Sequence, residues 1–306
     1  MNGLRQGSFR IFRLFGIDVF LHWSWFIIAL IEINTRERTY SSPIWNVVEY
    51  LGLFAIVTTH EFGHALACRQ VGGVANQIVL WPLGGVAYVD PPPRAAATLW
   101  SLAAGPLVNV VLLPILYGLH LLSGSLGWQY TLPDVYQLLL ALLAIDAGLL
   151  ILNMLPLYPL DGGQILRALL WFPLGRARSL MIATILGFVG MVGFVALVFR
   201  KHSVWLGAIA VFMLLNCWAG LQHARSLLRL AKMPRRAGFE CPACHAAPVV
   251  GEFWSCGLCK RPFDIFQSQG ICPNCSARFN ATRCIDCGAL HSIAEWSSPV
   301  PPRPLA

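Results

Sequence analysis

The chain has 306 residues, of which 57% are hydrophobic and only 12% are charged, and its mean hydropathy is +0.63. This composition excludes an ordinary soluble domain and predicts a polytopic membrane protein. Residues 1–236 carry 17 Lys and Arg against 9 Asp and Glu, which accounts for the whole net charge of +8, whereas residues 237–306 carry five of each. The basic excess therefore belongs to the membrane part, where it is expected to set topology, and nucleic acid is not an expected partner.

Six apolar segments are long enough to cross a lipid bilayer, if about 20 residues make one crossing. The first has no small-residue cleavage site and is interrupted by Asp18, His22 and Glu32, so we expect a membrane span rather than a cleaved leader. The six predicted transmembrane helices cover residues 16–34, 45–69, 97–121, 135–156, 178–199 and 203–228.

The basic residues are distributed unevenly between the two sides that these spans define. With a cytoplasmic N-terminus, thirteen Lys and Arg lie at cytoplasmic ends and loops, and four lie on the opposite side, namely Arg36, Arg38, Arg200 and Lys201. This agrees with the positive-inside rule. The prediction is a multi-pass protein of the cell membrane with both termini in the cytoplasm.

The second apolar segment contains His60-Glu61-Phe62-Gly63-His64. In a helix the two histidines lie one turn apart on the same face, so both can bind one metal ion while Glu61 reaches the water on that ion. Ionisable residues cost about 2.5–3.5 kcal/mol each in a membrane span, so they are rarely present without a function. The pattern predicts a zinc hydrolase rather than a structural polar cluster.

Between the second and third apolar segments, residues 77–89 are rich in β-branched and aromatic residues around a Pro and a Gly-Gly. This composition predicts a short β-hairpin. Open strand edges cannot face lipid, so the hairpin must lie against protein, in an aqueous cavity or at the interface. One interpretation is a tight connector without a function, and the other is an edge strand that binds an extended substrate by strand addition.

A hydrolytic zinc site needs three protein ligands, and the His60–His64 pair supplies two. The candidate for the third is Asp161, in a run where Pro156, Pro159 and Gly162-Gly163 make an uninterrupted helix unfavourable. Irregular backbone at membrane depth is tolerated only inside protein or beside a water-filled cavity, which a peptide hydrolase also requires. The alternative role of Asp161 is that of an N-cap for the helix that follows.

These residues resemble the site-2 protease group of intramembrane zinc metalloproteases, peptidase family M50. The likeness covers residues 10–225 and rests on three motifs in the family's order: HEFGH at 60–64, Gly-Pro-Leu-Val-Asn at 105–109, and Asn-x-x-Pro-x-x-Pro-x-Asp-Gly at 153–162. It implies that His60, His64 and Asp161 bind a catalytic zinc and that Glu61 is the general base. It also suggests that Asn153 and Asn109 are polar groups near the substrate.

The implied reaction is hydrolysis of peptide bonds in or near the transmembrane segments of membrane-protein substrates. Glu61 would take a proton from zinc-bound water and deliver it to the leaving amine, and the Asn153 amide could stabilise the oxyanion. Ordinary interhelical hydrogen bonding is the alternative role of Asn153 and the favoured role of Asn109. Because a transmembrane helix satisfies its own amides, the substrate must unwind locally, which predicts helix-weak residues near the cut.

Eight of the ten cysteines form four CxxC pairs near the C-terminus: Cys241/Cys244, Cys256/Cys259, Cys272/Cys275 and Cys284/Cys287. Two such pairs complete a tetrahedral four-thiolate site, so the prediction is a double zinc ribbon with two structural zinc ions. The spacing favours sequential sharing, with the first two pairs on one zinc and the last two on the other. A cross-braced order, first with third and second with fourth, is the alternative, and iron is the competing metal.

The predicted domains are an intramembrane metalloprotease at 1–230, a basic linker at 231–240, the double zinc ribbon at 241–290 and a disordered tail at 297–306. The neutral ribbon is expected to bind protein. The main alternative function is a catalytically silent membrane scaffold or zinc-responsive regulator with the same fold. The complete set of His60, Glu61, His64 and Asp161 argues against it, because a scaffold has no need of Glu61. A transporter is the third option, and the internal repeats expected of it are not found.

Overall fold

The computed structural model describes residues 7–35, 40–81, 84–201 and 204–296. It divides into two compact units, Met1–Leu221 and Gln222–Ala306, so the division falls within the last long helix rather than in the predicted linker at 231–240. The predicted disordered tail at 297–306 lies outside the described residues, as do Arg36 and Arg38.

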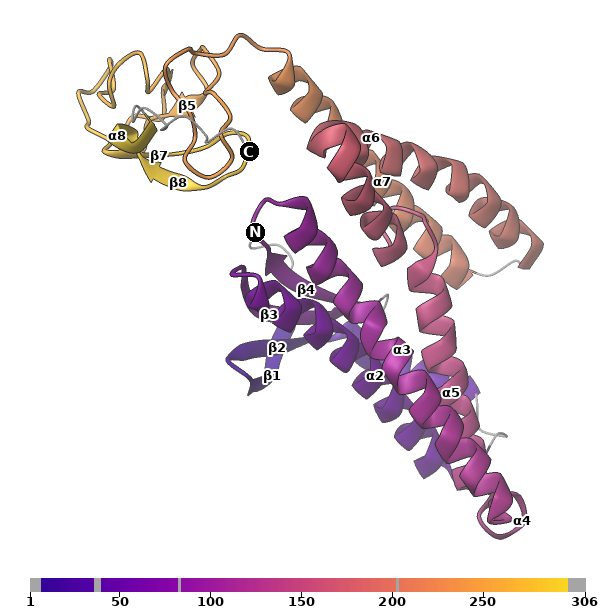
Figure 1. Cartoon of the computed structure of the whole chain (residues 1–306). Helices are drawn as coiled ribbons and strands as arrows, with labels where there is room; N and C mark the ends of the chain where they lie inside the picture. Colours follow the sequence, from indigo (N-terminus) through magenta and orange to yellow (C-terminus); the bar gives the residue numbers. More distant parts are fainter. Residues whose placement is uncertain (1–6, 36–39, 82–83, 202–203, 297–306) are drawn as a thin grey trace, which may run out of the picture. The chain divides into compact units, whose positions relative to one another are not determined.

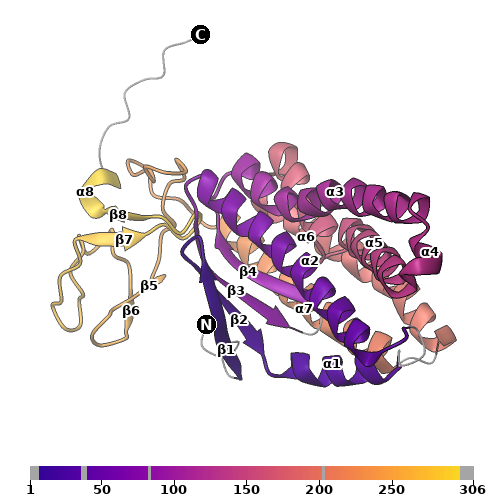
Figure 2. The same cartoon turned by 90° about the horizontal axis from the view of Figure 1, so that it is seen from below.

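A four-stranded sheet opens the first unit, in the order β1-β2-β3-β4 (Figure 2). The strands are β1 (Ser8–Leu14), β2 (Ile17–His22), β3 (Val74–Trp81) and β4 (Gly84–Asp90). Strand β2 pairs antiparallel with β1 and parallel with β3, and β3 pairs antiparallel with β4, as in the pair Ile78 and Ala87. The segment predicted as a short hairpin is therefore half of a larger sheet, and β4 is one of its two edges.

The predicted first span at 16–34 is wrong. Its first third is strand β2, and the helix that follows, α1 (Ser24–Thr35), has only 12 residues. Such a helix is about 18 Å long, which is shorter than the hydrocarbon core of about 30 Å. The chain reverses at Phe15 and Gly16, whose φ angles of 50° and 72° suit a two-residue hairpin turn. Alternate burial of Ile17 and Val19 then reflects a strand with one face on the core.

Helices build the rest of the first unit, and the last of them, α7, continues into the second unit (Figure 1). They are α2 (Pro43–Gln70), α3 (Ala95–Ser125), α4 (Trp128–Thr131), α5 (Pro133–Met154), α6 (Asp161–Lys201) and α7 (Val204–Ala231). Among the described residues, three helices are long and apolar enough to cross a membrane: α3, α5 and residues Asp161–Arg200 of α6. They correspond to three of the six predicted spans. Helix α6 kinks at Gly175, where φ is 76°.

Helix α2 forms the centre of this unit because it packs on the sheet with one face and on α3 with another. Ile17, Ile78 and Leu80 of the sheet are fully buried in one apolar cluster with Phe62 and Ala65 of α2. Helices α2 and α3 approach closely, since a Cβ atom at Gly63 would lie 2.7 Å from the Ala104 carbonyl oxygen. This packing holds the central turns of α2 between the sheet and α3.

The second unit contains four CxxC turns with the same backbone geometry. In one of them the Cys256 N–H donates to Arg261 O at 2.9 Å, and the Lys260 N–H donates to Cys256 O at 3.0 Å. The residue after each second cysteine has a positive φ, between 58° and 78°: His245, Lys260, Ser276 and Gly288. Short strands flank two of these turns, β5 (Trp254–Ser255) with β6 (Pro262–Phe263) and β7 (Ala281–Arg283) with β8 (Leu290–Ser292).

The four CxxC pairs are nested, so both predicted sharing orders are wrong. Cys256/Cys259 meets Cys272/Cys275 in an inner cluster, and Cys241/Cys244 meets Cys284/Cys287 in an outer cluster. Sulfur atoms from different pairs lie 3.5 and 3.6 Å apart in the inner cluster and 3.7 and 3.8 Å apart in the outer cluster. Tetrahedral zinc with bonds of about 2.3 Å separates sulfurs by about 3.8 Å, so both clusters fit zinc.

The core of the second unit is aromatic. Phe263, Phe266 and Trp296 are buried, and Trp296 lies on the short helix α8 (Ile293–Trp296), whereas Phe253 is 42% exposed. The rings of Phe266 and Trp296 lie 5.0 Å apart. Phe263 and Phe266 therefore belong to the core of this unit and not to an exposed face.

Asp264 ties three segments of this unit together. Its carboxylate accepts hydrogen bonds from the backbone N–H groups of Gly251, Phe266 and Gln267 and forms an ion pair with Arg236 at 2.7 Å. Burial alone would raise the pKa of Asp264, but the amide hydrogen bonds and the Arg236 guanidinium outweigh burial and hold the pKa below its ordinary value.

Candidate metal centre

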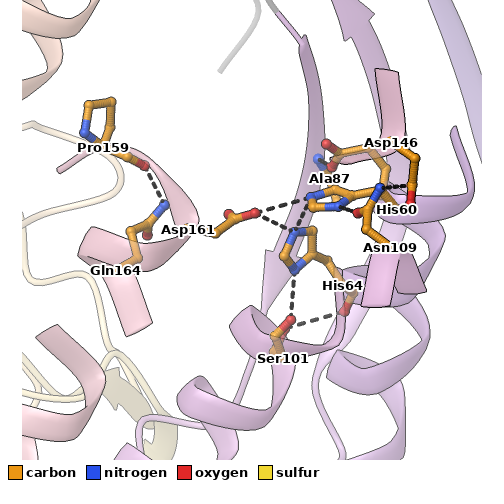
Figure 3. Close-up of polar contacts among 10 residues, drawn as sticks. His60, His64, Ala87, Ser101, Asn109, Asp146, Pro159, Asp161 and Gln164 are labelled. Carbon is orange, nitrogen blue, oxygen red and sulfur yellow. Dashed lines mark hydrogen bonds and ion pairs between the residues drawn. The ribbon is translucent and has the colours of Figure 1, made fainter. Parts of the chain in front are cut away.

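His60, His64 and Asp161 converge in the first unit (Figure 3). The Nε2 atoms of the two histidines lie 3.1 Å apart, and Asp161 Oδ2 lies 3.1 Å from His60 Nε2 and 3.4 Å from His64 Nε2. The histidines are one turn apart on α2, and Asp161 is the first residue of α6, 101 positions from His60. Both histidines are buried. A helix period supplies two members of the cluster, and tertiary structure brings the third to them.

The outer ring nitrogens determine what this cluster can bind. His64 Nδ1 lies 2.8 Å from the Ser101 carbonyl oxygen, which can only accept, so the proton of His64 is on Nδ1. His60 Nδ1 lies 2.5 Å from Asn109 Oδ1 in the same arrangement. Both Nε2 lone pairs therefore point toward each other and toward a carboxylate oxygen. Three acceptors that meet in this way require a cation or shared protons between them.

The separations in the cluster fit zinc. Tetrahedral zinc with bonds of about 2.0–2.1 Å to nitrogen and oxygen places neighbouring ligand atoms about 3.3 Å apart, and the three observed separations are 3.1, 3.1 and 3.4 Å. Metal-bound histidines usually donate their other ring N–H to a carbonyl or carboxylate group, as both do here. The donor set and its spacing thus suit a zinc ion with three protein ligands.

One face of α3 holds the two histidines in place. Ser101, Gly105 and Asn109 are four residues apart, so they lie along one side of the helix. Ser101 bonds His64 through its carbonyl oxygen, and Asn109 bonds His60. Between them, a Cβ atom at Gly105 would lie only 2.2 Å from His64 Nε2. The contacts of α3 therefore explain the 105–109 motif: Gly105 leaves space for the His64 ring, and Asn109 hydrogen-bonds His60.

Asn109, which the resemblance suggested as a polar group near the substrate, makes interhelical hydrogen bonds on both ends of its amide. The residue is fully buried, its Oδ1 faces His60, and its Nδ2 donates to Asp146 Oδ1 at 2.6 Å. Both ends of its amide thus have partners, one on α2 and one on α5, as the interhelical interpretation expects. The sequence motifs do not include Asp146 of α5, and the signal that could have found it is a carboxyl group in an apolar helix.

A break in the helices places Asp161. Helix α5 ends at Met154, and α6 begins at Asp161. The end of α5 and the chain after it fold back tightly on the start of α6. A Cβ at Gly162 would lie 2.5 Å from the carbonyl oxygens of Met154 and Leu155, and one at Gly163 would lie 2.4 Å from the backbone of the connecting segment. The Asp161 carboxylate points to the histidines rather than to the amides of its own helix, which does not favour the N-cap interpretation.

Glu61 connects the cluster to the edge of the sheet. Its side chain is buried, and its Oε2 accepts a hydrogen bond from the backbone N–H of Ala87 in β4 at 2.8 Å. That N–H consequently points away from β3, toward α2. A Cβ at Gly85 would lie 2.3 Å from Glu61 Cγ, so β4 lies directly against the glutamate. The edge strand and the candidate base are thus immediate neighbours.

Asn153 lies half-buried in the last turn of α5, eight positions before Asp161. Its side chain has no hydrogen-bond partner among the described residues, so its predicted role stays a prediction. Two other polar residues of apolar segments are bonded locally: Asn216 donates to Phe212 O of its own helix, and His22 contacts Ser24.

Comparison with known proteins agrees with this geometry. The model of peptidase family M50 matches residues 49–134 and 129–197, which include the histidine pair, Asn109 and Asp161 but none of the CxxC cysteines. A zinc metalloprotease of Methanocaldococcus jannaschii is 34% identical over 180 residues, which are 59% of this chain and 50% of that protein. The chain thus spans about half the length of this curated relative. The solved structure of a site-2 protease from the same organism has a TM-score of 0.50 and 26% identity, and the match covers 70% of this chain and 95% of that one.

Proposed function

Because the chain belongs to peptidase family M50, we propose that it is an intramembrane zinc metalloendopeptidase of the site-2 protease type. The observation that carries this proposal is the convergence of two histidine lone pairs and one carboxylate oxygen beside a buried glutamate. The cluster lies against α3 and at the start of α6, two of the helices that are apolar enough to cross a membrane. A silent scaffold has no use for such a costly group of ionisable side chains at membrane depth.

In this proposal His60, His64 and Asp161 hold the zinc ion. Zinc, when bound, acts as a Lewis acid that makes water acidic near neutral pH and polarises the peptide carbonyl. Glu61 takes a proton from the attacking water and returns it to the leaving amine. The Asn153 amide, near the start of the segment that leads to Asp161, is proposed to donate to the developing oxyanion.

The proposed substrates are transmembrane proteins that present an extended segment at the site. Strand β4 is an edge of the sheet, and one of its backbone donors already faces Glu61. A substrate that pairs with this edge would bring its backbone directly beside the base. Pairing requires an unwound segment, so substrates with helix-weak residues near the cut are expected to be preferred.

The test is cleavage and zinc content measured on the same protein. The full chain and its His60→Ala variant are purified in detergent and incubated with single-span membrane proteins, each with and without a helix-weak segment. We expect the unmutated chain to hold about three zinc ions and to cleave the helix-weak set, and His60→Ala to hold about two and to cleave none. His120→Ala, which alters a histidine of α3 outside the cluster, is the control and should behave as unmutated. Equal zinc in the unmutated and His60→Ala chains, or cleavage by neither, would favour the scaffold alternative.

The cysteine clusters are proposed to hold two structural zinc ions, with Cys256 and Cys272 on one ion and Cys241 and Cys284 on the other. Nesting makes a specific prediction. The double variant Cys256→Ala/Cys272→Ala should lose one zinc per chain, because both substitutions affect the same site. Sequential or cross-braced sharing would place these two residues on different sites, and the variant would then lose two.

The same measurement has a matched control in the pair Cys256→Ala/Cys284→Ala. These residues lie in different clusters, so this variant should lose both structural zinc ions. Zinc per chain, measured by metal analysis after exhaustive dialysis, separates the two variants. Equal losses in both would contradict the nested arrangement.

The topology proposed for the chain places the C-terminus in the cytoplasm, because basic residues gather at the end of the last long helix, at 225–236. Without the first predicted span, five crossings remain, and an odd number puts the two termini on opposite sides of the membrane. Helices α2 and α7, with 28 residues each, are long enough to add to the three candidate spans. The zinc ribbon is then cytoplasmic, and a protein is its proposed partner.

A further inference from the structure

Asp146 is a buried carboxyl group that the proposed reaction does not use. It lies on α5 among apolar residues and is fully buried. Its Oδ1 accepts from Asn109 Nδ2 at 2.6 Å, and its Oδ2 is buried without a hydrogen-bond partner among the described residues. A carboxyl group in an apolar membrane helix costs a few kcal/mol, about 2.5–3.5 on insertion scales, and one interhelical hydrogen bond recovers about 0.6 kcal/mol. A role in packing alone therefore does not account for it.

The contacts of Asp146 lead directly to the metal centre. Asn109 connects Asp146 to His60, with its Nδ2 on the carboxylate and its Oδ1 on His60 Nδ1 at 2.5 Å (Figure 3). An amide side chain has an NH₂ group that donates and an oxygen that accepts. A partner that binds the NH₂ group therefore leaves the oxygen to face the other partner. A carboxylate oxygen only accepts, and it therefore holds the donor end of Asn109.

We propose that Asp146 is a positioning residue of the metal centre, which fixes the Asn109 amide and through it the proton of His60. With Asn109 Oδ1 facing the ring, His60 keeps its proton on Nδ1 and presents the Nε2 lone pair to the metal. The inference rests on the proposed function only in taking His60, His64 and Asp161 to bind a metal ion.

The opposite orientation of Asn109 shows what the carboxylate prevents. If the amide turned by 180°, its oxygen would face Asp146 Oδ1 at about the same short distance, and two acceptors would repel each other. Its NH₂ group would then face His60 Nδ1, which would have to accept. The His60 proton would move to Nε2 and point at Asp161 Oδ2, 3.1 Å away. That hydrogen bond would occupy the lone pair that a metal needs.

The proposal is tested by exchanging the carboxylate at position 146 and the amide at position 109, first one at a time and then together. Asp146→Asn removes the group that fixes the amide, and Asn109→Asp places two carboxyl groups against each other. The double variant Asn109→Asp/Asp146→Asn restores the pattern, because a carboxylate at 109 accepts from both His60 and the amide introduced at 146. Ser123→Ala is the control, since Ser123 is buried on α3 and bonds only His120 O of its own helix.

The readout is zinc affinity of the membrane site, measured by competition with a chelator in purified full-length protein, with His60→Ala defining the zinc held by the cysteines. We expect each single variant to bind zinc about 10-fold to 100-fold more weakly, as for other groups that orient metal ligands. The double variant should recover affinity to within a few-fold of the unmutated chain, and Ser123→Ala should not change it. Recovery of zinc affinity in the double variant would show that positions 109 and 146 are energetically coupled, because the effects of independent substitutions add.

Two results would overturn the proposal. The first is that Asp146→Asn binds zinc as tightly as Ser123→Ala does. The second is that the double variant loses zinc affinity by the product of the fold-losses of the two single variants. If one single variant does not fold, the comparison of the other with the double variant decides. Zinc affinity is measured without a substrate. A chain that shows this coupling but cleaves nothing would contradict the proposed function and leave the role of Asp146 supported.

Discussion

Gly105→Ala is expected to remove zinc from the membrane site and to lower cleavage at least about 100-fold, which is the upper range for loss of a group that orients a metal ligand. The added Cβ would lie 2.2 Å from His64 Nε2, so the ring must move. The ring has little freedom to move, because Ser101 O holds its Nδ1 and Asp161 lies on its other side. Zinc per chain and the cleavage rate of the purified variant measure the effect.

Helix propensity does not explain such a loss, since alanine in a helix interior is about 1 kcal/mol more favourable than glycine. Gly118→Ala is the matched control. It lies on the same helix, and a Cβ there meets no atom within 4 Å. We expect Gly118→Ala to keep full zinc and activity. Full zinc in Gly105→Ala would show that His64 can leave its position without loss of the site, against the geometry described above.

Glu61→Gln is expected to retain zinc and to lower kcat by about 10²–10⁴-fold, the usual contribution of a general base. The amide oxygen of glutamine can still accept from Ala87 N–H, so the contact between α2 and β4 is kept and only the proton acceptor is lost. Zinc analysis and single-turnover cleavage of one helix-weak substrate separate a missing metal from a missing base.

The control for Glu61 is Glu49→Gln on the same helix. Glu49 is also buried and accepts a hydrogen bond, from Tyr40 Oη at 2.5 Å, but it lies three turns before the cluster. We expect cleavage within a few-fold of the unmutated rate. Cleavage by Glu61→Gln at a similar rate would mean that Glu61 serves only to hold β4, and another group would have to take the proton.

The features that the sequence alone could predict are local in the chain. His60 and His64 share a helix face because four residues make about one turn, and each CxxC pair forms its own turn because its hydrogen bonds close within six residues. The third member of the cluster, Asp161, was found because Pro and Gly around it interrupt an apolar run. Such patterns depend on helix period, ring geometry and backbone freedom, which act over a few residues.

The length and hydrophobicity of an apolar run did not predict a membrane span correctly where the run contains both a strand and a helix. Residues 17–22 have the apolar character of a span, yet they pair with β1 and β3 and bury alternate side chains on α2. The hairpin turn to β1 at Phe15 and Gly16 is local, but the other partner strand, β3, lies more than 50 residues away. Only the tertiary structure could show that the first predicted crossing is part of a sheet.

The sequence by itself thus determined which groups can bind metal: the histidine pair, the aspartate and the eight cysteines. The tertiary structure alone decided how they combine, since the nested sharing of the CxxC pairs and the line from Asp146 through Asn109 to His60 join residues 13 to 49 positions apart. Spacing constrains which groups can meet, but packing of helices and strands selects among the combinations that the chain can reach.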